Sequence, residues 1–186
     1  METLEAINKR ASLKTRISSR EIEAAKIDKI LEAGRVAPSG RNKQPWRFIV
    51  VKDKAIKDAL VTKSFNDVNH EAKEAPIIIV ACANPSDALT THEREFYLFD
   101  VALAVENIVL AATDLGLVTH LMTGLNEDEL KKVLGLPTEV RFVAATPLAY
   151  PTGDSYDEAV KERLSQRSRI DMQEMVYSDK WGKPFK

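Results

Sequence analysis

Continuous apolar runs predict the strands of a buried sheet. Residues 46–51 (WRFIVV) are aromatic and β-branched, a composition that favours a buried strand. Residues 77–83 (IIIVACA) are almost wholly apolar, as expected of a central strand that is covered on both faces. Residues 141–149 form a third such run, and residues 116–125 (GLVTHLMTGL) predict a turn, a short strand and a second turn.

Amphipathic periodicity predicts two helices ahead of the first strand. The first is expected over residues 3–9. The second is expected over residues 20–34, with Ser18-Ser19 as its N-cap and Gly34 as its C-terminal stop. The residues expected to face the core are Leu4 and Ile7 in the first helix and Ile22, Ile27, Ile30 and Leu31 in the second.

Shorter helices are expected between and after the strands. One covers residues 54–63, with Asp53 as its N-cap. Another begins after Asn126, because Asn126 and Glu129 have the spacing of a capping box, and it ends near residue 134. A last short helix is expected over residues 157–164.

The longest helical pattern covers residues 93–117 and is almost wholly apolar from Tyr97 onward. Its polar interruptions, Asp100, Asn107 and Asp114, recur every seven residues and therefore form one narrow stripe. A helix that is apolar around most of its circumference must be buried on several sides. We expect a central helix or a helix at a subunit interface.

Strands that alternate with helices, followed by a final arm, predict an α+β fold with one mixed sheet. At 186 residues, we expect residues 1–186 to form a single domain. The formal net charge of −1 gives no reason to expect nucleic acid or an anionic membrane as a partner. The N-terminus lacks the apolar run of a signal peptide, and no uncharged stretch is long enough for a membrane span, so a cytoplasmic location is expected.

The cysteine and histidine content argues against a disulfide or a metal centre. Cys82 is the one cysteine, and its place in a predicted core strand favours a buried, inert thiol over a nucleophile. His70 and His92 lie in polar stretches without clustered Cys, His or carboxylate partners, so they are expected at the surface. No metal is predicted.

Two kinds of segment carry the candidate chemistry. Residues 38–44 (PSGRNKQ) have turn composition and lead directly into a core strand, which is a suitable place to hold a ligand, although an ordinary turn would have the same composition. Arg10 and Lys14 flank Ser12, and a phosphate requires such charged and geometric donors, although an ordinary basic surface turn remains an alternative. The chain contains neither GxGxxG nor a Walker A motif, so a nucleotide-like cofactor would need cationic side chains for its phosphate.

Three motifs in the same order resemble those of the FMN-dependent nitroreductase family. They are Arg10-Ala11-Ser12-Leu13-Lys14, then Pro38-Ser39 with Asn42 and Gln44-Pro45-Trp46, and finally Arg167-Ser168-Arg169. The resemblance extends over nearly the whole chain. It implies a nitroreductase-like sandwich, in which helices flank a central mixed β-sheet and an extended C-terminal arm follows.

The resemblance also implies the cofactor and the reaction. FMN would pass hydride through its N5 atom from NADH or NADPH to a nitroaromatic compound, a quinone or a similar acceptor by ping-pong kinetics. No side chain would be catalytic, because the flavin performs the chemistry, and Lys14 would tune it from beside the pyrimidine edge. Backbone N–H groups of Thr123 or Gly124 would face N5. Many relatives have Glu at the position of Thr123, a departure that affects substrate fit more than flavin binding.

The residues implied in cofactor binding are Arg10, Ala11, Ser12, Lys14, Pro38, Ser39, Gly40, Asn42, Gln44, Asn69, Met122, Thr123, Gly124, Arg167 and Arg169. Relatives often place an Asn near the flavin, and Asn66 is an alternative to Asn69 for that role. His120 is expected to be a spectator rather than a proton donor.

The resemblance implies a homodimer in which both chains build each FMN site. Arg10, Ser12, Lys14 and the tail arginines would come from one chain and the Ser39–Asn42 loop from the other. The apolar helix supports a subunit interface, and so does the arm, whose anchors are Met172, Met175 and Val176. The alternatives are a flavoprotein of the same fold with another redox task, such as dehalogenation, enoate reduction or flavin breakdown, and a non-catalytic flavin-binding protein.

Overall fold

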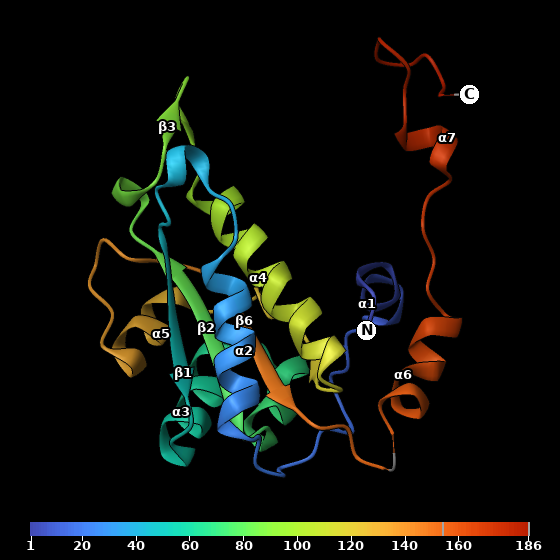
Figure 1. Ribbon diagram of the computed structural model, residues 1–186. Coiled ribbons are helices and arrows are strands. Elements are labelled where there is room, and N and C mark those ends of the chain that lie inside the picture. The colour runs from blue at the N-terminus through green and yellow to red at the C-terminus, as the bar shows by residue number, and fades with distance from the viewer. Residues whose placement is uncertain (154, 186) are drawn as a thin grey trace.

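A four-stranded sheet forms the centre of the computed structural model, which describes residues 1–153 and 155–185 (Figure 1). Its order is β1 (Trp46–Val51), β2 (Ile77–Ala83), β6 (Arg141–Ala149) and β5 (Val118–Thr119). Adjacent strands pair antiparallel, with Ile79 of β2 opposite Val50 of β1 and Thr146 of β6. A parallel bridge between Ser12 and Thr119 adds the N-terminal segment beside β5 and makes the sheet mixed.

Helices cover both faces of the sheet because β2 is apolar on both faces. Ile77 and Ile79 pack into a core with α2 (Ala24–Arg35) and α4 (Tyr97–Asp114). Ile78 and Val80, which alternate with them along the strand, pack into a second core with α3 (Lys54–Ser64) and α5 (Glu127–Leu134). Every residue of β2 is buried, which confirms the expected central strand.

The N-terminal segment and the helix that follows β6 pack together beside β5. Ala11, Leu13 and Val118 share a small apolar core with Val160 of α6 (Tyr156–Ser165). In Figure 1, α1 (Thr3–Lys9) and α6 lie next to each other, and the C-terminal arm (residues 166–185), which includes α7 (Met172–Met175), extends away from the body. The remaining elements are η1 (Gly40–Asn42), η2 (Asp67–Glu74), η3 (Pro85–Asp87), β3 (Thr90–Thr91) and β4 (Arg94–Glu95).

Two predicted caps are confirmed by their hydrogen bonds. The Asp53 carboxylate accepts from the backbone N–H of Ile56, and the Asn126 side chain accepts from that of Glu129. The expected bounds of α1, β1, β2 and β6 are also confirmed. Long apolar runs and side-chain caps were therefore reliable signals in this chain.

The predicted start of the second helix is wrong, and Gly34 is not its stop, although the predicted end lies within one residue of the observed end at Arg35. The helix α2 begins at Ala24, and no side chain caps it. Ser18 instead donates its backbone N–H to the carbonyl of Tyr150, which holds this segment extended. Gly34 lies inside the helix, where an added Cβ would come within 2.9 Å of Ile108, so its function is close packing rather than termination.

The predicted inward positions of α1 are also wrong. Leu4 is 74% exposed, and Ala6 is the residue of α1 that is buried. The helix α4 begins at Tyr97 rather than residue 93, because residues 90–95 form the β3–β4 hairpin. Its first turn exposes Leu98 and Phe99, so the long apolar helix is only partly covered within one chain.

Among the described residues, no helix has the length and apolar character needed to cross a membrane. The same part of the chain contains no cluster of three or more potential metal ligands. Cys82 is buried, and burial raises the pKa of its thiol, which agrees with the expected inert thiol.

Candidate functional site

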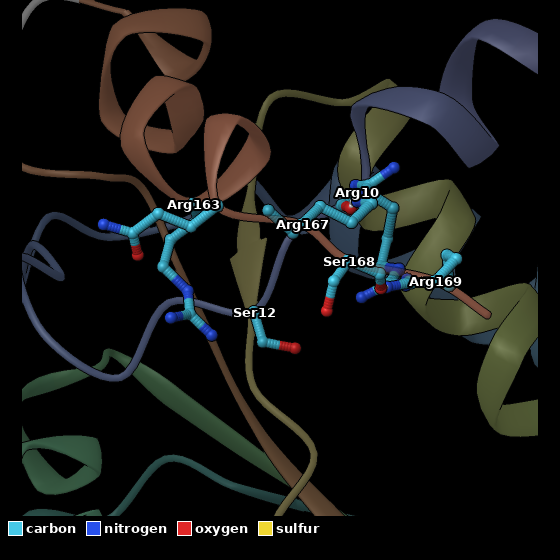
Figure 2. Close-up of a pocket in the computed structure, with 8 residues that line it drawn as sticks. Arg10, Ser12, Arg163, Arg167, Ser168 and Arg169 are labelled. Carbon is cyan, nitrogen blue, oxygen red and sulfur yellow. Dashed lines mark hydrogen bonds between the residues drawn. The ribbon is translucent and has the colours of Figure 1, made fainter.

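A cavity of about 260 Å³ lies between the N-terminal segment and the end of α6 (Figure 2). We call it the arginine–serine cavity. The residues that line it are Arg10, Ala11, Ser12, Arg163, Gln166, Arg167, Ser168 and Arg169. Figure 2 shows the Ser12 hydroxyl between the side chains of Arg163 and Arg169.

Helix ends build this cavity. Arg10 is the C-cap residue of α1, and Gln166 is the C-cap residue of α6. The guanidinium of Arg167 donates to the carbonyl of Asn8, at 2.9 Å, and to that of Arg10, so it joins the two helix ends. Arg167 therefore has a structural task in addition to its positive charge.

The charges of the cavity are uncompensated within the described residues. No described carboxylate lies within ion-pair distance of its four arginines. Burial lowers the pKa of Arg167, and the nearby positive charges of Arg10 and Arg169 lower it further. A bound anion would relieve this repulsion, and guanidinium and hydroxyl donors suit a phosphate monoester.

Of the residues that line this cavity, the sequence motifs had proposed Arg10, Ala11, Ser12, Arg167 and Arg169 for cofactor binding, but not Arg163 or Ser168. Arg163 lies four residues before Arg167. Arg163 lies in the last turn of α6, and Arg167 follows the C-cap residue Gln166, so the end of this helix brings both side chains to the cavity.

Lys14 borders a second cavity, also of about 260 Å³, that adjoins the first. Ser12 and Arg163 line both cavities. The backbone N–H of Leu13 donates to the carbonyl of Thr119 at 3.1 Å, and this pairing places Lys14 beside β5. A phosphate in the first cavity would therefore leave the remainder of its molecule near Lys14.

Residues 120–124 follow β5 and pack against the start of η2. Met122 is buried and pairs with Ala145 of β6. Thr123 is exposed, and the carbonyl of Gly124 accepts from the backbone N–H of Asn66 at 3.3 Å. An added Cβ at Gly124 would come within 2.6 Å of the Asn66 amide nitrogen, so a side chain at this position would displace Asn66.

The two candidate asparagines differ in their surroundings. Asn66 is exposed, whereas Asn69 is buried and its Oδ1 lies 3.1 Å from Nε2 of His120. His120 is half-buried. Burial lowers its pKa, as do the positive charges of Lys14 and Arg163, so the ring is neutral at pH 7.

The loop of residues 38–44 lies elsewhere. Figure 1 shows it beside the β3–β4 hairpin, at the end of the molecule away from α6. It lines neither of the two cavities described above. Within one chain, this loop is therefore separate from the arginines of the arginine–serine cavity. The proposed cofactor-binding residues that it contains are Pro38, Ser39, Gly40, Asn42 and Gln44.

The loop nevertheless has a defined structure. The Ser39 hydroxyl accepts from the backbone N–H of Gln44 at 2.9 Å. Arg41, Asn42 and Gln44 have left-handed backbones, with φ of 51°, 56° and 50°. Such conformations are uncommon for side chains like those of Arg and Gln and persist only where surrounding contacts impose them.

Comparison with known proteins gives one family and several relatives. Residues 7–75 and 69–150 match the model of the Nitroreductase family. The chain is 30% identical over 185 residues to the "Putative NADH dehydrogenase/NAD(P)H nitroreductase" of Archaeoglobus fulgidus, covering 97% of this chain and 99% of the relative. It is 25% identical over 182 residues to iodotyrosine deiodinase 1 of mouse, covering 83% of this chain and 64% of that protein.

Solved structures show the same fold. A nitroreductase family protein from Clostridium novyi NT is 37% identical with a TM-score of 0.78, covering 100% of this chain and 98% of that one. An FMN-dependent nitroreductase from Clostridium difficile R20291 is 25% identical with a TM-score of 0.69, covering 82% of this chain and 89% of that one.

Proposed function

Because the chain belongs to the nitroreductase family, we propose that it is an FMN-dependent oxidoreductase that takes electrons from NADH or NADPH. Nitroaromatic compounds, quinones or similar small molecules would accept those electrons. The observation that carries the proposal is the arginine–serine cavity, whose four guanidinium groups and two serine hydroxyls form a donor set for a phosphate monoester. The names of the Archaeoglobus and Clostridium difficile relatives support the electron donor and the cofactor.

The phosphate of FMN would bind in the arginine–serine cavity. Arg10, Ser12, Arg167 and Arg169 would hold it, with Ala11 as part of the wall and Arg163 as a further donor. The four arginines of the cavity line one small space, which suits a single terminal phosphate such as that of FMN. The sequence offers no Gly-rich dinucleotide fingerprint, which would be expected of many proteins that bind a second phosphate and an adenine.

Bound FMN would supply the hydride chemistry, and the chain would orient and tune it. Lys14 would place a positive charge beside the pyrimidine edge, where a fixed cation favours the more negative, reduced state. Backbone N–H groups at Thr123 or Gly124 would orient the flavin. The buried Met122 would anchor that segment to the core. No side chain in this arrangement acts as a nucleophile.

We also propose that the active unit is a homodimer with two shared sites. The loop of residues 38–44 is defined in structure but separate from the arginine–serine cavity of its own chain. Large apolar side chains are exposed on α1, on the first turn of α4 and along the C-terminal arm, including Leu4, Phe99, Met172 and Trp181. A two-fold dimer would cover these residues and bring the loop of one chain to the cavity of the other.

A second candidate function is reductive dehalogenation. The relationship to mouse iodotyrosine deiodinase 1 favours it, because that protein aligns with 83% of this chain. Both functions would use the same cavity and the same flavin. The difference would lie in the residues that contact the acceptor.

Two measurements on the purified protein test the proposal. Chromatography of the released cofactor should identify FMN, and anaerobic mixing with NADH or NADPH should bleach the bound flavin. A panel containing a nitroaromatic compound, a quinone and iodotyrosine should then reoxidise it at different rates. Recovery of FAD, or of no flavin after incubation with FMN, would rule out the cofactor, whereas bound FMN that no nicotinamide reduces would indicate a binding protein.

A further inference from the structure

Asn69 and His120 form a polar pair at the edge of the core. They are 51 residues apart in sequence, and Oδ1 of Asn69 lies 3.1 Å from Nε2 of His120. Both backbones are held: Asn69 donates its N–H to the carbonyl of Asn66, and His120 donates its N–H to the hydroxyl of Thr146 at 3.0 Å. The pair therefore joins η2 to the segment that follows β5.

The chemistry of the contact assigns the proton on the ring. Oδ1 of an asparagine can only accept, so Nε2 of the neutral His120 must carry the hydrogen and donate it. Nδ1 is then the bare acceptor, and it is buried without a partner among the described residues. The bond to Asn69 is consequently the one hydrogen bond that the His120 ring makes among those residues.

The side-chain nitrogen of Asn69 has no hydrogen-bond partner among the described residues. Asn69 is only 6% exposed, yet its Nδ2 donates to no described residue. This nitrogen is not among the buried side-chain atoms that lack a partner, so it keeps contact with solvent. Nδ2, the part of the Asn69 side chain that solvent reaches, is thus a hydrogen-bond donor that no described residue uses.

The pair lies next to the chain segment that holds Lys14, where the ring of the cofactor is expected. His120 directly follows Thr119, which pairs with Ser12 and Leu13, and its ring lies within electrostatic range of Lys14. The pyrimidine edge of a flavin presents two carbonyl oxygens, which accept hydrogen bonds, and one N–H group, which donates. Because Oδ1 of Asn69 is already occupied by His120, the group that Asn69 can offer is Nδ2, which suits a carbonyl oxygen rather than the N–H group.

We propose that His120 is a positioning residue that holds the Asn69 amide with Nδ2 directed at a carbonyl oxygen of the flavin's pyrimidine edge. This inference rests on the proposed function. It selects Asn69 over Asn66 as the asparagine that reaches the flavin. Without His120, the amide could rotate and present its own oxygen to that carbonyl, which repels it.

Conservative variants separate this task from mere packing. His120→Gln keeps an N–H donor that can reach Asn69, whereas His120→Leu fills similar space without a donor. FMN titrations followed by fluorescence quenching should give an unchanged Kd for the Gln variant and about a tenfold weaker one for the Leu variant, the size of one net hydrogen bond. Asn69→Asp, which lacks Nδ2, should weaken FMN similarly, and adding His120→Leu to it should cause little further loss.

The outcomes distinguish the two levels of the proposal. If wild-type protein fails to bind FMN, the proposed function fails. If wild-type protein binds FMN and the Leu variant binds equally well, or the Gln variant is as weak as the Leu variant, only the role of His120 is wrong. A nitrogen NMR spectrum of the wild-type imidazole should show hydrogen on Nε2 of His120, and hydrogen on Nδ1 would overturn the inference even if the Leu variant does not fold.

Discussion

Gly40 and Asp100 join the loop of residues 38–44 to the long helix, since the backbone N–H of Gly40 donates to Oδ1 of Asp100 at 3.0 Å. Asp100 is fully buried in the first turn of α4, where the helix dipole favours a negative charge. Its second oxygen has no hydrogen-bond partner among the described residues. One partly buried hydrogen bond thus anchors a loop in which Arg41, Asn42 and Gln44 have left-handed backbones.

Asp100→Leu should weaken this anchor. The substitution leaves the partly buried N–H of Gly40 without its acceptor, so the loss should lie near the lower end of the about 1–3 kcal/mol that an unpaired buried donor costs. Urea unfolding should show that loss, and hydrogen exchange of the amides of residues 40–44 should become faster. Asp100→Asn is the matched control, because its amide oxygen can still accept, and its free energy of unfolding should lie within about 1 kcal/mol of wild type. Equal exchange rates in all three proteins would show that Asp100 does not hold the loop.

Arg169→Ala should weaken FMN binding by about ten- to a hundredfold, the range for one charge-assisted hydrogen bond. Riboflavin, which lacks the phosphate, should bind the variant and wild type alike. Lys161→Ala removes the same charge from an exposed position on α6 outside the cavity and serves as the control. If the variant lost equal affinity for FMN and for riboflavin, Arg169 would not bind the phosphate.

Lys14→Met should lower the two-electron potential of the bound flavin and slow its reduction by NADH or NADPH. The reason is the loss of a positive charge beside the pyrimidine edge. Equilibration with a reference dye measures the potential, and Thr15→Ala, in the wall of the same cavity but uncharged, is the control. An unchanged potential in the Met variant would remove Lys14 from the tuning of the cofactor.

The stability of the protein should respond to His120 below neutral pH. Burial and the charges of Lys14 and Arg163 lower the pKa of His120 below its ordinary value of 6.5. The unfolded chain therefore binds a proton at His120 more readily than the folded chain does. As a result, the free energy of unfolding falls as the pH drops below about 6.5. Urea unfolding between pH 7 and pH 5 should show a smaller decline for His120→Gln than for wild type, and parallel declines would contradict the expectation.

The sequence predicted the sheet and most helices because their signals are local. The run of β2 is apolar on both faces, and Asp53 and Asn126 cap their helices as expected. The start of α2 was missed because the pairing of Ser18 with Tyr150, 132 residues away, holds an apparent N-cap extended. Periodicity identified the apolar face of α1 but could not show that it points outward in one chain.

The site was predictable to the extent that it lies in short motifs. Arg10, Ser12 and the tail arginines meet in one cavity, as the motif order suggested. The pairing of Asn69 with His120 depends on how η2 packs against the chain after β5, and no local pattern records that contact. The separation of the 38–44 loop from the arginines also became visible only in three dimensions.

Mixed dimers provide the most direct measurement of the proposed FMN site, which combines the arginine–serine cavity of one chain with the 38–44 loop of another. Two inactive variants, one altered at Arg10 and one at Asn42, would be unfolded together and refolded as a mixture. In a mixed dimer one site contains both substitutions and the other contains neither. Random pairing makes about half of the dimers mixed, and each has one intact site of two, so about one quarter of wild-type activity should be restored. If mixed dimers form and the mixture remains as inactive as its parents, each site belongs to a single chain and the shared site is wrong.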